Sequence, residues 1–313
     1  MQDKIGQLLA KEMDKKGDEG SIIKWIHKND IRNEKNDPIS FDEHPFLVQI
    51  YTDNSNDQVQ SKCAQVGSST CAILKGFYFA KTKNYNIIHT LPTVDFSADF
   101  VKSKVDPMAM ANRKSVNITK KTDSVRHKEI GLAHLFYRGT HKETEAITIS
   151  ADILINDEYD RSNLAVIDTF ESRLDRSDYR RKWLFSNPTV PNYGIDYLYK
   201  ESKQFHWMIK CSHCNNWHYM RYPDSLDFDR KMFICIKCRR EITDQERLDG
   251  IWIAKYRGRE TNGYWLSQLF CIWHDAASIV RKSKKQKKDV FYNFTLGVPY
   301  EGSEVSIKRE HIL

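Results

Sequence analysis

The chain has 313 residues, of which 40% are hydrophobic and 12% aromatic, so it can bury at least one sizeable core. This composition excludes an intrinsically disordered protein, and the apolar runs are far shorter than the roughly 20 residues of a membrane-spanning helix. The formal net charge of +7 is a mild bias towards polyanionic partners, and the charged N-terminus predicts no signal peptide.

The first part of the chain is rich in charged residues. Apolar residues at helical spacing predict two short amphipathic helices, over residues 5–13 and 22–26. Residues 33–38 have the composition of a linker. We therefore expect residues 1–40 to form an N-terminal helical arm and linker, peripheral to the core.

An apolar segment follows at residues 41–51. Nucleotide-binding folds often place a segment that contacts the base at this distance before the phosphate-binding loop. Two interpretations remain open for it, contact with a base and packing in the core.

The stretch at residues 62–70 reads KCAQVGSST and lies between an alternating segment and an apolar run with helical spacing. Strand, tight turn and helix form the context of a phosphate-binding loop, whose backbone N–H groups face anionic oxygens. In the Walker A pattern, G-x-x-x-x-G-K-[ST], a lysine follows the second glycine. Here Gly67 is that glycine, Ser68 replaces the lysine, and Lys62 stands at the place of the first glycine.

Lys62 could reach the β- and γ-phosphates from the other end of this loop. Ser69 would supply the hydroxyl group for Mg²⁺, with Thr70 as its substitute. An ordinary strand-to-helix turn rich in small residues is the alternative that this stretch leaves open. The candidate ATP contacts are Lys62, Gln65, Val66, Gly67, Ser68, Ser69 and Thr70.

The next elements alternate between strand and helix. Residues 85–93 predict a short strand ending in a turn, and residues 95–105 predict an amphipathic helix. Residues 107–123 are polar, and we expect them to be exposed. Residues 125–137 predict a hairpin or strand pair around Gly131.

The second informative stretch is ILINDE at residues 153–158, a short apolar run that ends in two carboxylates. Such a strand delivers its acids to the edge of a parallel sheet where ligands bind, which is the Walker B half of a phosphate-loop ATPase. Asp157 would hold Mg²⁺, and Glu158 would orient and deprotonate the attacking water. A strand followed by an acidic turn is the competing interpretation.

Residues 164–174 predict a helix, and residues 183–186 predict a third buried strand. Small polar residues at the end of this strand could sense the γ-phosphate. They are Ser186, Asn187, Pro188 and Thr189. The alternation from residue 57 to 204 implies βαβ units, so the predicted fold class is α/β: a P-loop NTPase of the ASCE type, with a mostly parallel sheet flanked by helices.

Four of the seven cysteines form two pairs with the pattern C-x2-C-x20-C-x2-C. Two thiolate pairs on tight turns give the tetrahedral sulfur set that structural Zn²⁺ prefers, and a closed set leaves no position for metal catalysis. A redox pair is the competing interpretation. We therefore predict an inserted zinc ribbon that folds with its metal. The ligands are Cys211, Cys214, Cys235 and Cys238.

The other cysteines, Cys63, Cys71 and Cys271, are expected to be small buried residues. An odd number of cysteines without a secretory signal suggests a reducing compartment. Of the histidines near the cysteine pairs, His213 and His218 are expected on the surface rather than as ligands.

Beyond the ribbon, residues 250–253 and 263–266 predict strands that return to the main body. Residues 276–288 predict a helix with a basic end. Such a run is usually a solvated face, but it could contact DNA phosphates. The expected domains are the arm at 1–40, an ATPase core at 41–205, the zinc ribbon at 206–245, and the C-terminal part of the ATPase domain at 246–313.

In this order the stretches resemble the large terminase subunit of tailed phages, in its lambda-like branch, over about residues 41–302. The resemblance is carried by KCAQVGSST at 62–70, ILINDE at 153–158, FSNPT at 185–189, the two cysteine pairs, GIW at 250–252 and FTLGVPY at 294–300. The resemblance implies an ATPase motor that pumps double-stranded DNA into a preformed capsid. Members of this family join the motor to a C-terminal nuclease.

The resemblance also assigns roles to residues. Lys62 and Ser69 match the residues that bind phosphate and Mg²⁺, Asp157 the metal acid, and Glu158 the catalytic base. A lysine at the start of the loop is a known variation in that family. Residues 186–189 match the segment that couples hydrolysis to movement. The trans-acting arginine stays open among Arg126, Arg138, Arg161 and Arg173.

The implied cofactors are ATP and Mg²⁺, beside the Zn²⁺ of the ribbon. The implied partners are double-stranded DNA, the small terminase subunit and the capsid portal protein, in the host cytoplasm and without a membrane. The sequence ends at Leu313, where the nuclease should begin, so we expect ATPase activity without DNA cleavage and a separate or missing nuclease.

Two functions from other classes remain open. A non-enzymatic zinc-ribbon module, which binds nucleic acid or a capsid protein on a degenerate nucleotide-binding fold, is favoured by the serine at position 68. A helicase would have similar ATPase halves, but the sequence contains no convincing strand-separation motif. Mg²⁺-dependent ATP hydrolysis, with and without DNA, separates the motor from the binding module.

Overall fold

The computed structural model describes residues 21–302, so the helix expected over residues 5–13 lies outside the described part. The chain divides into two compact units. The first unit contains the described residues up to Gln58 and residues 67–184, and the second contains residues 59–66 and those from 185 onwards. Two strands, β1 (Asp57–Lys62) and β7 (Arg181–Ser186), have residues in both.

A mixed sheet with a parallel centre forms the core of the first unit. In spatial order its strands are β7, β6 (Ile153–Asp157), β2 (Ile87–Leu91), β5 (Ala133–Gly139), β4 (His127–Ile130) and β3 (Ile118–Asp123). β2 runs parallel to both β6 and β5, and every residue of β2 and β6 is buried. Strands covered on both faces have this continuous burial, as the sequence predicted for residues 153–157.

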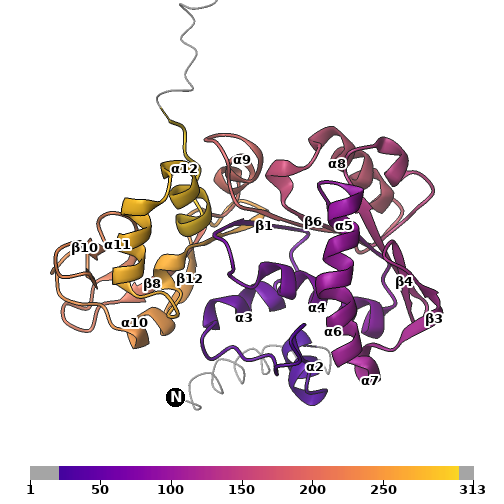
Figure 1. The fold of residues 1–313 in the computed structure, drawn as a ribbon, viewed down its shortest axis with the longest axis horizontal. Helices are drawn as coiled ribbons and strands as arrows, with labels where there is room; N and C mark the ends of the chain where they lie inside the picture. The colour runs from indigo at the N-terminus through magenta and orange to yellow at the C-terminus, as the bar shows by residue number, and fades with distance from the viewer. Residues whose placement is uncertain (1–20, 303–313) are drawn as a thin grey trace, which may run out of the picture. The chain divides into compact units, whose positions relative to one another are not determined.

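The expected hairpin around Gly131 is confirmed. β4 pairs antiparallel with β5, Ile130 lies opposite Ala133, and Gly131 has a φ of +64°. β3 pairs with β4 in the antiparallel direction, and Figure 1 shows these two strands side by side at one edge of the first unit. The antiparallel ribbon therefore extends the parallel part of the sheet.

The helices of the first unit connect and cover these strands. They are α2 (Ile22–Lys28), α3 (Pro45–Thr52), α4 (Ser68–Lys83), α5 (Val94–Phe100), α6 (Asp106–Ala111), α7 (Arg113–Val116) and α8 (Leu164–Glu171). α2 buries Ile22, Ile23 and Ile26 and packs on α3 and α4. This part of the expected arm therefore contributes to the core.

The expectation that residues 107–123 are exposed is wrong for one face of this stretch. Met108 and Val116 are fully buried, and Asn112 between them is 4% exposed. These residues follow one another at a spacing of four, which places them on one face of helical segments. The amide of Asn112 donates to the carbonyl oxygen of Arg32 at 2.7 Å and accepts from its N–H at 2.8 Å, so the polar member of the row is satisfied.

The second unit has a smaller sheet with the order β12 (Ile251–Ala254), β8 (Phe205–Lys210), β13 (Asn262–Leu266) and β1. β9 (Trp217–Tyr219) pairs with β8, and β10 (Leu226–Asp227) pairs with β11 (Met232–Phe233). The strands predicted at 250–253 and 263–266 are therefore present.

Its helices are α9 (Gly194–Glu201), α10 (Asp244–Leu248), α11 (Ala276–Lys285) and α12 (Lys288–Val290), followed by a π-helical turn, η6 (Phe291–Leu296). The basic helix ends at Lys285 rather than at 288, because Gln286 is extended. No helix within residues 21–302 is long and apolar enough to cross a membrane.

A buried lysine joins two helices of the first unit. Lys75 on α4 is 1% exposed, and its ammonium group donates to the carbonyl oxygens of Ile50 at 3.2 Å and Asp53 at 3.0 Å. It also lies 4.0 Å from the ring centroid of Trp183. Burial lowers the pKa of Lys75, and the carbonyl groups at the C-terminus of α3 favour its charged form.

We expect Lys75→Met to lower the free energy of unfolding by about 2–3 kcal/mol, because it leaves two buried carbonyl groups without their charged donor. Chemical denaturation followed by circular dichroism measures the change. Lys81→Met, at an exposed position of the same helix, is the control and should change stability by less than about 0.5 kcal/mol. Equal losses in both variants would contradict this role.

Candidate nucleotide site and cysteine cluster

The phosphate-loop stretch turns into α4 at Gly67. This glycine has a φ of +89° and precedes the first residue of the helix, Ser68. A Cβ atom at Gly67 would lie 2.9 Å from the side chain of Leu47, so both the backbone conformation and the space favour glycine. The first N–H groups of a helix point out of its N-terminus, so the start of α4 is suited to an anion.

The first turn of α4 meets the C-terminal end of β6 in the first unit. The hydroxyl group of Ser69 donates a 2.6 Å hydrogen bond to the carboxylate of Asp157, which is 3% exposed. Residues 88 positions apart thus bring one hydroxyl and one carboxylate oxygen into contact. Oxygen ligands of these two types are the ones that Mg²⁺ takes beside nucleotide phosphates.

Glu158 follows β6 directly and has a φ of +64°, which is unusual for a residue with a side chain. Its side chain is 18% exposed, and one of its oxygens lies 3.8 Å from the guanidinium group of Arg161. Strained backbone of this kind is concentrated at functional sites. The acid therefore stays accessible at the end of the strand that carries Asp157.

A buried network fixes the ends of β2 and β6. The amide of Asn156 donates to the hydroxyl groups of Thr90 at 2.8 Å and Ser162 at 3.2 Å, and Thr90 donates to the carbonyl oxygen of Ile155 at 3.1 Å. No role was predicted for Thr90, Asn156 or Ser162 from the sequence. Polar residues at the ends of neighbouring buried strands were the pattern that could have identified them.

The opening residues of the loop lie in the second unit. Lys62 is 7% exposed, and its carbonyl oxygen accepts a 2.8 Å hydrogen bond from the amide of Asn187. The N–H groups of Cys63 and Ala64 donate to the carbonyl oxygens of Leu266 and Phe294, each at 2.8 Å. Hydrogen bonds from three distant segments therefore hold the backbone of residues 62–64.

The segment at residues 186–189 contacts the loop through Asn187. Ser186 is fully buried, and its hydroxyl donates to the carbonyl oxygen of Asn187 at 3.0 Å. The carbonyl oxygen of Thr189 accepts from the N–H of Tyr300 at 3.1 Å. The segment is thus tied both to Lys62 and to the chain after η6.

A cavity of about 480 Å³ lies in the first unit beside the end of the loop. Its lining includes Phe41, His44 and Tyr51, together with Gly67 and Thr70. The rings of Phe41 and Tyr51 pack edge to face with their centroids 5.2 Å apart, and burial lowers the pKa of His44. Residues 41–51 therefore pack in the core and also border a space next to the loop.

The four paired cysteines converge in the second unit. The sulfur atoms of Cys211 and Cys238 are 3.7 Å apart, as are those of Cys214 and Cys235, and all four lie within 4.8 Å of one another. Four sulfurs at about 2.3 Å from a central Zn²⁺ would be roughly 3.8 Å apart, so the cluster fits this ion.

The thiols of the cluster differ in their pKa values because their surroundings differ. A hydrogen bond from the backbone N–H of Arg240 lowers the pKa of Cys238 to about 7, whereas burial raises the pKa of Cys211 to about 12. A metal would bind all four as thiolates.

His213 is exposed as expected, but the expectation for His218 is wrong. His218 is 3% exposed because it lies on β9 opposite Ile209 of β8, which is also buried, and burial lowers its pKa. Neither histidine belongs to the metal-binding group found among the described residues. The three other cysteines, Cys63, Cys71 and Cys271, are buried as predicted.

Comparisons with known proteins give a family match and matches in fold. A family model described as "Phage terminase large subunit gpA, ATPase domain" matches residues 34–260. The large terminase of bacteriophage HK97 has a TM-score of 0.56 at 12% identity, over 89% of this chain and 55% of that one. The ATPase domain of the Thermus phage P74-26 large terminase has a TM-score of 0.51 at 11% identity, over 78% and 88%.

These identities indicate a shared fold only. The chain spans about half the length of large terminases such as the HK97 protein. No protein with a curated description matches the sequence.

The cysteine cluster leads to a test by metal analysis. We expect one Zn²⁺ per chain, and we expect Cys214→Ser to lose it, because three thiolates do not close a tetrahedral site. Chelation should abolish the aromatic circular dichroism of the ribbon. Cys71→Ser, outside the cluster, is the control and should keep its zinc. Retention of zinc by Cys214→Ser would contradict the assignment.

Proposed function

Because the chain belongs to the family of phage terminase large subunits, with its match in the ATPase domain, we propose that it is the ATP-hydrolysing motor of viral DNA packaging. In this proposal it translocates double-stranded DNA into a procapsid. The observation that carries the proposal is the contact between Ser69 on α4 and Asp157 at the end of β6. This contact joins the helix of a phosphate loop to the acid of a neighbouring strand.

The triphosphate would lie along residues 65–70, with the N-terminus of α4 facing its oxygens. Lys62 would contact the β- and γ-phosphates in place of the lysine that is absent at position 68. The cavity beside Gly67 and Thr70 supports a site for the base, since it adjoins the same loop.

Ser69 and Asp157 would hold Mg²⁺, and this ion neutralises charge on the phosphates when it is bound. Glu158 would accept a proton from the attacking water. Its position directly after Asp157, with its side chain partly exposed, supports that role. Glu158 would thus act on the attacking water and Asp157 on the ion.

Coupling would pass through Asn187. Its amide is bonded to the carbonyl oxygen of Lys62, so movement at the loop would reach the segment of Ser186, Asn187, Pro188 and Thr189 directly. Thr189 would pass the movement on through its contact with Tyr300. The cysteine cluster would hold a structural Zn²⁺ without a part in hydrolysis, because four thiolates leave no open position.

As a packaging motor the chain would act in the host cytoplasm with double-stranded DNA, the small terminase subunit and the capsid portal protein. DNA cleavage would require a nuclease domain in addition to the ATPase domain. The basic side chains of α11, with Arg281, Lys282, Lys284 and Lys285, suit contact with DNA phosphates.

The function is tested by Glu158→Gln. We expect the variant to bind ATP within about threefold of the wild type and to lose at least about a hundredfold in kcat, because the amide cannot accept the proton. Steady-state hydrolysis with Mg²⁺, with and without double-stranded DNA, measures the loss.

Glu143→Gln is the matched control, since Glu143 is an exposed acid of the same unit. Unchanged turnover in Glu158→Gln would exclude Glu158 as the base. Absence of hydrolysis in the wild-type chain under all these conditions would favour the non-enzymatic binding module.

A further inference from the structure

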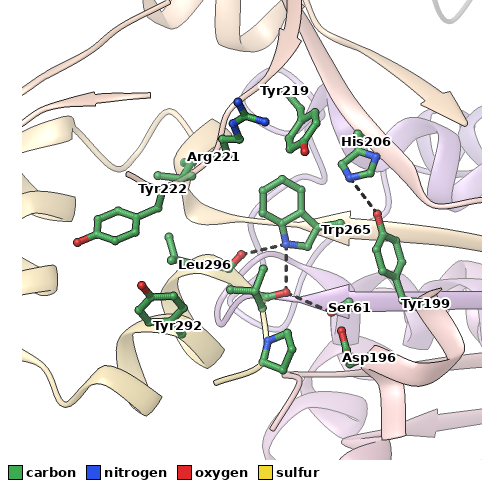
Figure 2. Close-up of a pocket in the computed structure, with 14 residues that line it drawn as sticks. Ser61, Asp196, Tyr199, His206, Tyr219, Arg221, Tyr222, Trp265, Tyr292 and Leu296 are labelled. Atoms are coloured by element: carbon green, nitrogen blue, oxygen red, sulfur yellow. Dashed lines mark hydrogen bonds between the residues drawn. The ribbon is translucent and has the colours of Figure 1, made fainter. Parts of the chain in front are cut away.

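The second unit contains a cavity of about 240 Å³ that none of the roles above uses (Figure 2). It lies within this unit alone and is distinct from the cysteine cluster and from the cavity beside Gly67. Sites for drug-sized ligands occupy about 300–1,000 Å³, so this cavity suits a smaller ligand of one ring system.

Two groups of aromatic rings form its walls. On one side Tyr222 and Tyr292 pack nearly perpendicular to each other, with their centroids 6.0 Å apart. On the other side Trp265 packs on Tyr219 at 5.9 Å, and Tyr219 packs on His206 at 4.3 Å. Within residues 21–302 no ring contact joins these two walls, and Figure 2 shows Tyr222 and Tyr292 to the left of Trp265. The walls thus present aromatic faces and edges to whatever enters.

The rim carries an arginine. Arg221 is 47% exposed and forms a 2.8 Å ion pair with Asp224, which is 51% exposed. An ion pair between two such exposed groups contributes little, and a guanidinium group has five donors, so Arg221 can still bind an anion.

The carboxylate at the bottom of the cavity already has partners within the protein. Asp196 is 5% exposed and accepts from the ammonium group of Lys200 at 2.7 Å and from the N–H of Asn192 at 2.7 Å. Its charge is therefore already compensated. With Arg221 at the rim as well, a quaternary ammonium ligand would be repelled, although aromatic walls can bind such groups.

Aromatic walls and one anion-binding group at the rim match the chemistry of a nucleotide. Bases stack on aromatic side chains regardless of their identity, and arginine binds phosphate oxygens in pairs. We propose that this cavity binds one nucleobase between its aromatic walls, with the attached phosphate on Arg221.

The nucleobase can come from two sources, a free mononucleotide or an unpaired base of a DNA strand. Binding of a free nucleotide goes beyond the packaging function proposed above. Only binding of an unpaired DNA base rests on the packaging function.

The floor of the cavity connects it to the phosphate loop. The indole N–H of Trp265 donates to the carbonyl oxygens of Leu296 and Gly297, both at 3.1 Å, and Ser61 donates to Gly297 at 3.1 Å. A Cβ at Gly297 would lie 2.8 Å from the backbone nitrogen of Cys63, so the floor packs directly on the loop backbone.

The test uses the zinc-loaded chain with Mg²⁺ and saturating inorganic tripolyphosphate, which occupies the phosphate loop but carries no base for the cavity. Calorimetry with dAMP and dTMP measures the free-nucleotide source. Fluorescence of a single-stranded oligonucleotide that contains 2-aminopurine measures the strand source, and the same oligonucleotide in a full duplex is the reference.

We expect one additional site per chain. Arg221→Gln and Tyr292→Leu should each weaken binding by about 5- to 100-fold, as expected for loss of a phosphate contact or a stacking face. Trp265 is left unchanged because its hydrogen bonds hold the floor of the cavity. Arg257→Gln and Tyr256→Leu change exposed residues of the same unit and should leave binding unchanged.

Binding of mononucleotides supports a free-nucleotide ligand, and binding of the single strand alone supports a base of DNA. Absence of binding by both, equal losses in the control variants, or binding of the duplex alone would overturn the proposal. ATP hydrolysis by the same preparations is measured in parallel. Hydrolysis without binding of any probe refutes only the base site, and binding without hydrolysis refutes only the motor.

Discussion

The contact between Ser69 and Asp157 is the constraint on which the first unit depends. It requires α4 to begin where β6 ends, and this occurs only if the helix packs on a sheet whose strands run parallel. The burial of β2 and β6 and the polar network of Asn156 and Thr90 maintain that position. A hydroxyl and a carboxylate can then share one small cation, which is the chemical core of the site.

The beginning of the loop is fixed by a different kind of interaction. The backbone of residues 62–64 is bonded to Asn187, Leu266 and Phe294, and Gly297 packs against it without a side chain. Most of these bonds use backbone atoms of distant segments. The loop is therefore preorganised by the fold, and in our proposal Lys62 then takes the role of the lysine that is absent at position 68.

Much of this could be predicted from the sequence because it depends on local patterns. The patterns of polar and apolar residues predicted β1, α4 and β6, and the spacing of the cysteines predicted their cluster. The wrong predictions concern residues whose burial depends on tertiary packing. Met108 and Val116 are buried within a polar stretch, and His218 is buried on a paired strand. The aromatic cavity draws residues from Ser61 to Pro299, and no local pattern joins positions so far apart.

The central claim is that Ser69 and Asp157 bind the same metal ion beside ATP. The most direct measurement is the Mg²⁺ concentration for half-maximal ATP hydrolysis in the wild type, Ser69→Ala, Asp157→Asn and the double variant. A shared ion predicts strong non-additivity, with either single change raising the requirement nearly as much as both together. Independent, additive effects of the two changes would contradict the account.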